Sequence, residues 1–119
     1  MSAGPMLTVA AAFVVAATLA GAGNARADGD PVRGGQLYRA CVACHSLEPG
    51  THLTGPSLAG LWQRPAGRTE GFARYSAGLK AAAFDWDAAV LDAWLADPRA
   101  MIPDTRMVFR GIPAERDRA

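Results

Sequence analysis

The chain has 119 residues, of which 50% are hydrophobic and 19% charged, and its 12 Lys and Arg residues nearly balance 11 Asp and Glu residues. A chain of this length holds one small domain after any leader. The balanced charge gives none of the concentrated basic character that nucleic-acid binding requires. Composition therefore excludes a large multidomain protein and argues against a nucleic-acid partner.

The first 27 residues predict an export signal. The alanine-rich apolar run from Leu7 to Ala20 is short for a membrane span, and Ala25-Arg26-Ala27 has the small-x-small pattern of a signal-peptidase site. We therefore expect a signal peptide over residues 1–27, cut before Asp28, and a single periplasmic domain over residues 28–119. Since Met1 to Met6 contains no Lys or Arg, two alternatives stay open: a misplaced start codon, or an uncut leader that associates the protein with the membrane.

The first helix of the domain is expected to begin at Asp30. Asp is a favoured N-cap residue, and Pro31 suits the first helical position because the missing N–H has no helical partner there. We expect the helix to run through Leu37 and Tyr38 into two cysteines.

These cysteines belong to the segment Cys41-Val42-Ala43-Cys44-His45, which has the C-x-x-C-H spacing of covalent haem attachment. Two thiols at this spacing can add to the two vinyl groups of a haem, and the adjacent imidazole can reach the iron. An oxidising compartment would not leave the two thiols free. The segment therefore predicts one haem c, bound through Cys41 and Cys44, with His45 as an axial ligand.

Three other uses of the motif compete with this one. A thioredoxin-like redox pair would require a βαβ surround, whereas the flanks here indicate a helix that runs into a loop. A zinc site would need four ligands, so His52 would have to complete it, and the neighbours Cys44 and His45 point poorly toward one centre. The third alternative is a short-loop disulfide.

The rest of the chain predicts short helices and loops. Residues 48–71 are rich in Gly, Pro, Thr and Ser, and a short helix is expected from Ser76 to Ala82. A clearer helix begins near Asp87 and ends at Pro98, and its apolar face carries Val90, Leu91, Trp94 and Leu95. Residues 99–109 are expected to be irregular. Because little strand-like alternation is present, the predicted fold class is all-α.

A haem iron held by one histidine has a sixth position to fill. A thioether there is a soft donor that raises the reduction potential, which suits an electron carrier. Met101, Met107 and His52 are the candidates. The residues alone leave the choice open, because a methionine can equally be a gap-filling core residue.

Several blocks along the chain form one ordered pattern between Gly34 and Ile112: the Cys41–His45 motif, Thr54-Gly55-Pro56 with Leu58 and Gly60, Arg64, Gly71-Phe72 with Tyr75-Ser76, Trp86, Leu95-Ala96-Asp97-Pro98, and Ile102 to Phe109. Taken together, they resemble the class I c-type cytochromes, in particular the mitochondrial cytochrome c and bacterial cytochrome c2 branch. The resemblance implies a small cytochrome c fold, with short helices and loops wrapped around one covalently bound haem.

The resemblance also implies individual roles. His45 and Met107 would be the two iron ligands, and Pro56 would accept a hydrogen bond from the His45 imidazole. His52 would tie its loop to the loop near Glu70 rather than bind iron. Four residues would surround the haem propionates: Arg64, Tyr75, Trp86 and Thr105. The full set of implied haem-binding residues is Cys41, Cys44, His45, Pro56, Leu58, Arg64, Tyr75, Trp86, Trp94, Thr105, Met107 and Phe109.

The chain departs from the family pattern in three places. Trp94 stands where many relatives have tyrosine, and Asp104 replaces a glycine, which an aspartate can tolerate if its φ is positive. After Ile112 the family continues into a C-terminal amphipathic helix, which is absent here, so we expect the face of the first helix near Leu37 to lie open. An incomplete gene model, a partner that fills the groove, or reduced stability would explain this.

The predicted function is that of a periplasmic monohaem electron carrier that cycles between Fe(II) and Fe(III) and performs no substrate chemistry. Its partners would be a redox donor and an acceptor, such as membrane respiratory or photosynthetic complexes or a dehydrogenase. A basic rim at Arg99, Arg106 and Arg110 would assist docking, unless these residues are only a solvated face. The alternatives are a haem subunit of an assembly or a ligand-binding or peroxidase-like haem enzyme.

Overall fold

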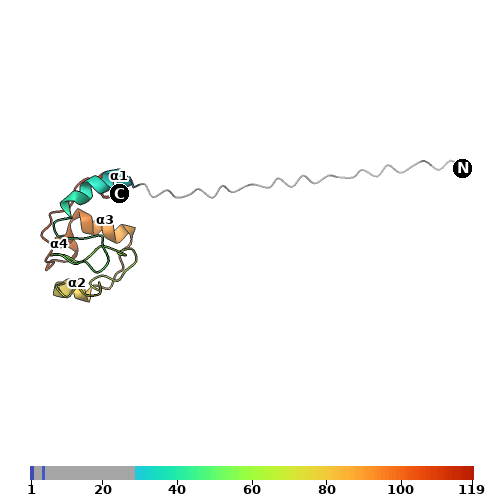
Figure 1. The fold of residues 1–119 in the computed structure, drawn as a ribbon. Helices are drawn as coiled ribbons and strands as arrows, with labels where there is room; N and C mark the ends of the chain where they lie inside the picture. Colours follow the sequence, from blue (N-terminus) through green and yellow to red (C-terminus); the bar gives the residue numbers. More distant parts are fainter. Residues whose placement is uncertain (2–3, 5–28) are drawn as a thin grey trace.

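The computed structural model describes residues 29–119 together with Met1 and Gly4. Apart from those two residues, the expected signal peptide over residues 1–27 lies outside the described part of the chain. Residues 29–119 form short helices joined by long loops, with one isolated β-bridge and no longer strand, so the all-α prediction is confirmed (Figure 1). Among these helices, none combines the length and the apolar character that a membrane span requires.

Helix α1 spans Pro31–Leu37 and begins where the sequence predicts it. Oδ1 of Asp30 accepts hydrogen bonds from the backbone N–H groups of Val32 (2.9 Å) and Arg33 (3.2 Å). These bonds satisfy two of the donors that a helix start leaves without partners. A 3-10 turn, η1 (Tyr38–Ala40), then continues to the cysteines, so the expected single helix tightens before the motif.

Helices α2 (Ala77–Ala81) and α3 (Ala88–Ala96) also lie where they are predicted. Each has a side-chain cap: Ser76 Oγ and Asp87 Oδ1 accept from the backbone N–H three residues on, at 3.2 and 2.8 Å. In Figure 1, α1 and α3 lie in the upper part of the domain, whereas α2 lies at its lower end. The long loops between the motif and α3 therefore cross from one end to the other.

Pro98 begins a helix as well as ending one. Helix α4 spans Pro98–Met101, and Asp97 Oδ1 accepts from the N–H groups of Arg99 (3.0 Å) and Ala100 (3.2 Å). The prediction that the chain is irregular from residue 99 is therefore wrong for residues 99–101. The physical reason is that an Asp-Pro pair forms a helix start, as it does at α1, because proline needs no N–H partner in the first turn.

Residues 102–105 form a tight turn ahead of Met107. The N–H of Thr105 donates to the carbonyl of Ile102 at 2.9 Å. Among the described non-glycine residues, a positive φ occurs only at Gln63, so Asp104 does not adopt the positive φ considered for it. A turn with proline second and aspartate third is built from ordinary backbone angles.

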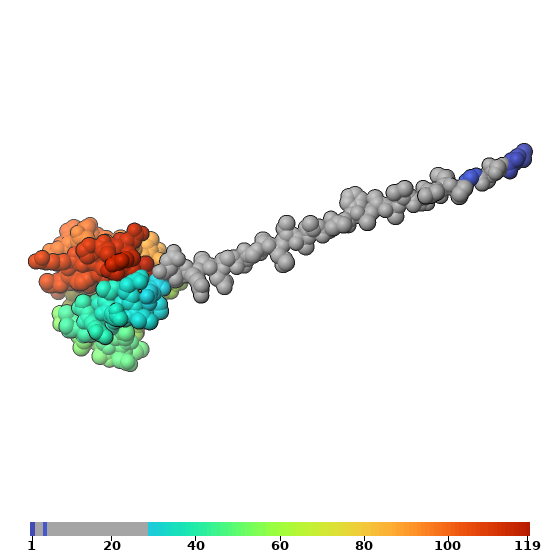
Figure 2. Space-filling view, turned by 90° about the horizontal axis from the view of Figure 1, so that it is seen from above, coloured from blue at the N-terminus to red at the C-terminus, as the bar shows by residue number. Residues whose placement is uncertain are grey.

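The C-terminal residues form one further turn of helix, α5 (Glu115–Arg118), which packs against α1 and α3. Arg33 donates to the carbonyl of Arg116 at 2.8 Å, and Arg118 pairs with Asp92 of α3 at 2.8 Å. Figure 2 shows the two ends of the described domain side by side, the C-terminal residues in red and the α1 residues in cyan. The single turn of α5 therefore contacts α1, the helix whose face was expected to lie open.

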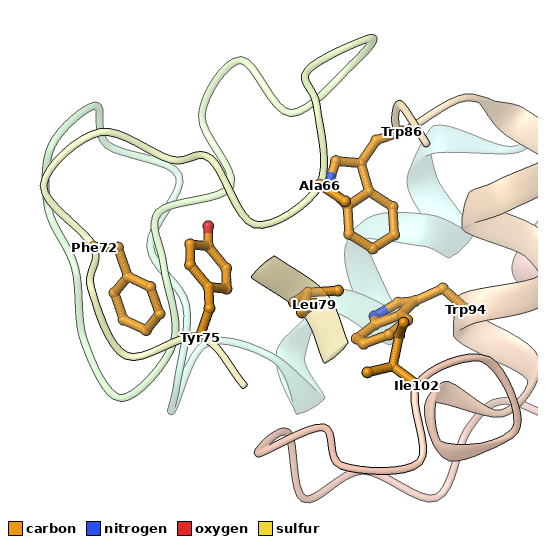
Figure 3. Close-up of a cluster of buried hydrophobic side chains, with 7 residues drawn as sticks. All are labelled: Ala66, Phe72, Tyr75, Leu79, Trp86, Trp94 and Ile102. Carbon is orange, nitrogen blue, oxygen red and sulfur yellow. The ribbon is translucent and has the colours of Figure 1, made fainter. Parts of the chain in front are cut away.

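The hydrophobic core is small and rich in aromatic residues. Leu79 of α2 lies between Tyr75 on one side and Trp94 and Ile102 on the other (Figure 3). The Trp86 and Trp94 rings meet edge to face, with their centroids 5.4 Å apart, a favoured arrangement for aromatic pairs. The buried members are Ala66, Phe72, Tyr75, Leu79, Trp86, Trp94 and Ile102.

Candidate functional site

The Cys41–His45 motif forms a tight turn directly after η1. The N–H groups of Cys44 and His45 both donate to the carbonyl of Cys41, at 3.1 and 2.9 Å. Both thiols are free, with Cys41 half-buried and Cys44 exposed. Burial raises the pKa of the Cys41 thiol, and Cys44 adds to this shift. The turn therefore presents two reduced sulfurs and one imidazole within a five-residue segment.

Pro56 holds the His45 imidazole in one orientation. Nδ1 of His45 lies 2.7 Å from the carbonyl oxygen of Pro56. Because a carbonyl can only accept, Nδ1 carries a proton, and in the neutral imidazole the lone pair is then on Nε2. The Tyr38 hydroxyl donates to the backbone carbonyl of His45 at 3.2 Å. The ring is thus fixed with one nitrogen suited to metal coordination.

Gly55 packs against the same imidazole. Its N–H donates to the carbonyl of Cys44 at 2.7 Å. A Cβ at position 55 would stand 2.8 Å from Nδ1 and 2.9 Å from Nε2 of His45, closer than real contacts allow. The absence of a side chain at Gly55 therefore lets the loop close onto the ring.

A cavity of about 490 Å³ lies beside His45. Its walls come from α1, η1 and the cysteine motif, the loops between residues 54 and 76, helices α2 and α3, and the segment from Thr105 onward, and most of the wall is apolar. A mostly apolar cavity with few polar groups suits a buried organic ligand. It brings together all of the residues predicted to bind haem, namely Cys41, Cys44, His45, Pro56, Leu58, Arg64, Tyr75, Trp86, Trp94, Thr105, Met107 and Phe109.

Arg64 has a buried donor that indicates which kind of ligand the cavity can bind. Its Nη1 donates to the carbonyl of Ala59 at 2.9 Å, and its Nη2 lies 3.4 Å from the carbonyl of Ser57. Nε of Arg64 is buried and has no partner among the described residues. The Tyr75 hydroxyl accepts from the N–H of Thr69 at 3.3 Å, which leaves its own proton to donate. An unpartnered buried donor is costly, so a bound group with acceptor oxygens fits here.

Among the three candidates for a second iron ligand, only Met107 is part of the described cavity wall. The Met107 N–H donates to Oγ1 of Thr105 at 3.3 Å, and Thr105 itself is buried. Met101 packs against the hydrophobic core outside this wall. The fold therefore brings one thioether and one imidazole to the same cavity.

His52 uses both of its ring nitrogens within the protein. Nδ1 accepts from the N–H of Ser57 at 3.0 Å, and Nε2 donates to the carbonyl of Glu70 at 2.9 Å. This is the loop-tying contact that the resemblance implies. A histidine so engaged has no lone pair left for a metal, which removes the fourth ligand that the zinc alternative needs.

Sequence reasoning missed several contributors to the site, among them Leu79 and Tyr38. Leu79 is the one bulky apolar residue of α2, and a short helix with one such residue usually buries it, so a signal was available. Tyr38 gave no comparable signal, because its partner is a backbone carbonyl rather than a side chain.

These features fit a covalently bound haem, since the cavity combines two thiols, an imidazole with a free lone pair, a thioether and an unpartnered buried donor. The three exposed arginines of the expected basic rim differ in placement. Arg106 is part of the cavity wall, whereas Arg99 and Arg110 lie outside it.

The chain is similar to known cytochromes over most of its length. It is 37% identical over 115 residues to cytochrome c-554 of Methylosinus trichosporium, which covers 96% of this chain and 84% of that protein. It is 42% identical over 91 residues to cytochrome c2 of Rhodoblastus acidophilus, which covers 76% of this chain and 84% of that protein.

A solved cytochrome structure also has the same fold as this chain. The structure of cytochrome cH from Methylobacterium extorquens matches with a TM-score of 0.70 and 37% sequence identity, covering 76% of this chain and 90% of that one. No family model matches the chain.

Proposed function

The chain belongs to the class I c-type cytochromes, and on this basis we propose that it is a periplasmic monohaem electron carrier that shuttles electrons between redox partners. Members of this family carry electrons and are not enzymes. When bound, haem supplies an iron that cycles between the ferrous and ferric states. The remaining work falls to the residues of the chain.

Each of these residues has a distinct task. Cys41 and Cys44 hold the porphyrin through thioethers, which prevents loss of the cofactor. His45 offers Nε2 to the iron, and the hydrogen bond to Pro56 (2.7 Å) increases the basicity of the ring. Met107 offers a soft sulfur that favours the reduced iron and raises the potential.

The polar residues of the cavity wall hold the carboxylates of the cofactor. Arg64 provides the cation and the unpartnered Nε, and Tyr75 provides a hydroxyl proton. Buried carboxylates stay ionised only when such groups compensate for lost hydration. Trp86 and Thr105 belong to the same wall and complete the set.

The observation that carries the proposal is the shared cavity wall. His45, Met107 and both cysteines of the motif line one cavity, although the sequence separates His45 from Met107 by most of the domain. A peroxidase-like enzyme would instead need a vacant iron position beside a distal histidine or arginine; Met107 lines the cavity as the candidate for that position, and both nitrogens of His52 are engaged elsewhere.

Docking to partners would use the exposed surface around the cavity. Arg99, Arg106 and Arg110 are all exposed, so they can attract an acidic partner surface by weak, salt-sensitive contacts. The partners are one donor and one acceptor of electrons. Membrane association is expected only if the leader stays uncut.

Replacing the thioether tests this function. We expect Met107→Ala to abolish the thioether-to-iron absorption band, to lower the reduction potential and to let the reduced protein bind carbon monoxide. The matched control is Met101→Ala, because Met101 is a partly buried methionine outside the cavity wall. An unchanged band in Met107→Ala, or ready carbon monoxide binding by the wild type, would contradict the ligand assignment.

A further inference from the structure

Asp104 links the segment that carries Met107 to a distant helix. Its Oδ2 accepts a hydrogen bond from the backbone N–H of Gly78, in the first turn of α2, at 2.9 Å. Gly78 lies two residues after Ser76, the N-cap of that helix. The contact therefore joins two parts of the chain that are 26 residues apart.

Gly78 is shaped to receive this carboxylate. A Cβ on Gly78 would stand 3.0 Å from Cγ2 of Ile102 and 3.2 Å from Cγ of Asp104, and closer still to one carboxylate oxygen. The turn at residues 102–105 can therefore approach α2 only because position 78 has no side chain. Two residues from separate elements thus fit each other.

No other hydrogen bond does the same for the Met107 segment. Among the described residues, the Gly78 N–H to Asp104 bond is the only hydrogen bond that joins residues 103–109 to a distant part of the chain. The remaining bonds here are local: Thr105 N–H to Ile102 O at 2.9 Å, and Met107 N–H to Thr105 Oγ1 at 3.3 Å. Hydrogen bonds therefore connect α2 to the turn at residues 102–105, and this turn to the backbone of Met107.

We propose that Asp104 is a positioning residue that fixes the Met107 segment through its hydrogen bond to Gly78 at the start of α2. This contact between Asp104 and Gly78 is called the clasp below. This inference rests on the proposed function, because it takes Met107 as an iron ligand. The clasp restrains the backbone three residues before the sulfur, and its loss raises the fraction of molecules in which Met107 leaves the iron. The hydrogen bond from the Gly78 N–H is the main cause that lowers the pKa of Asp104, so the carboxylate is charged at neutral pH.

Competition with imidazole measures that fraction. Imidazole added to the ferric holoprotein binds where Met107 has left, so its apparent affinity rises in proportion to the open fraction. Loss of the clasp in Asp104→Ala is expected to raise the apparent affinity about threefold or more, the scale of one hydrogen bond. Asp104→Asn keeps an oxygen that accepts from Gly78, so it should stay within about twofold of wild type.

Asp30→Ala is the matched control. Asp30 caps α1 with the same type of carboxylate-to-backbone bond (2.9 Å to Val32) and also has a lowered pKa, but it lies far along the chain from Met107. Its loss should lower the overall stability and leave the imidazole affinity within about twofold of wild type. An equal rise in Asp30→Ala and Asp104→Ala would show a general loss of stability and overturn the clasp.

Gly78→Ala gives an independent route that leaves Asp104 in place. Its added Cβ pushes against the carboxylate, so we expect faster hydrogen exchange at the residue 78 amide and tighter imidazole binding. The change should have a smaller effect in an Asp104→Ala background, because the two residues act through one contact. Additive effects, or an Asp104→Ala protein with wild-type imidazole affinity, would refute the proposal. A wild-type protein without the thioether-to-iron band would refute the proposed function instead.

Discussion

At the scale of single residues, the orientation of His45 depends on its two neighbours across the loop, Gly55 and Pro56. Pro56 fixes the tautomer through the 2.7 Å hydrogen bond, and Gly55 allows the loop to approach the ring. Neither residue carries chemistry of its own. Both are needed because a metal ligand must present its lone pair in one direction.

Gly55→Ala should therefore destabilise the protein. The new Cβ would lie 2.8 Å from Nδ1 of His45, so the ring or the loop has to move. Overpacking of this kind costs about 1–3 kcal/mol of unfolding free energy. Denaturant unfolding of the holoprotein measures the loss, and the reduction potential should shift with the ring.

Gly35→Ala is the control for the glycine change itself. Gly35 lies inside α1, and a Cβ there would meet nothing within 4 Å. Alanine is the better helix former, so this variant should be about 0.5–1 kcal/mol more stable than wild type. If Gly55→Ala unfolded at the same denaturant concentration as Gly35→Ala, the packing argument for His45 would be wrong.

Residue types and family pattern predicted which side chains gather at the cavity, but not how the loops hold them. Cys41, His45 and Met107 could be named from chemistry and resemblance. For Asp104, the sequence shows only that it replaces a glycine of the family pattern, and predicts no contact for its side chain. Its partner is a backbone N–H of α2, 26 residues away. Almost every residue type has a backbone N–H, so the sequence does not indicate which residue makes this contact.

At the scale of elements, the pair Asp97-Pro98 does two jobs. It ends α3, and it begins α4 through bonds from Asp97 to the N–H groups of Arg99 (3.0 Å) and Ala100 (3.2 Å). The same pair of residue types predicts the helix start at Asp30 and Pro31. At Pro98 the sequence predicts only a helix end, because a strong apolar pattern precedes this proline and none follows it.

Asp97→Ala should lower the unfolding free energy by about 1 kcal/mol, the usual cost of losing an N-cap. Asp97→Ser restores an acceptor and should recover most of that loss. Asp85→Ala is a suitable control, since Asp85 is exposed and makes no side-chain hydrogen bond within the described residues. Thermal or urea unfolding compares the three, and equal stability of the two alanine variants would show that the cap is unimportant.

The contact between α5 and α1 could not be predicted from the sequence. Arg33 reaches the carbonyl of Arg116 across 83 residues. No periodicity or motif encodes a side-chain bond to a backbone carbonyl at that separation. The expected open face of α1 followed from the family pattern, whereas the α5 turn follows from contacts that only the folded chain reveals.

At the scale of the whole molecule, most residues of the hydrophobic core also line the cavity. Apart from Ala66 and Ile102, every buried hydrophobic residue of the core also lines the cavity. A domain this small buries too little apolar surface to be stable with such a cavity left empty. The bound cofactor would complete the core.

A chain that cannot attach the cofactor should therefore fold poorly. We expect Cys41→Ser combined with Cys44→Ser to lose most of its helical circular dichroism and its cooperative unfolding. Val42→Ser lies between the two cysteines and changes an exposed side chain, so it should keep the wild-type signal. Full helix content and a sharp transition in the double variant would show that the protein core is sufficient alone.

The most direct test of the account is the intact mass of the exported protein, followed by peptide mapping, from cells able to mature c-type cytochromes. We predict the mass of one haem added to each chain, carried by the peptide that contains Cys41 and Cys44, with neither thiol open to alkylation. A mass equal to that of the polypeptide alone, with both thiols alkylated after reduction, would contradict it.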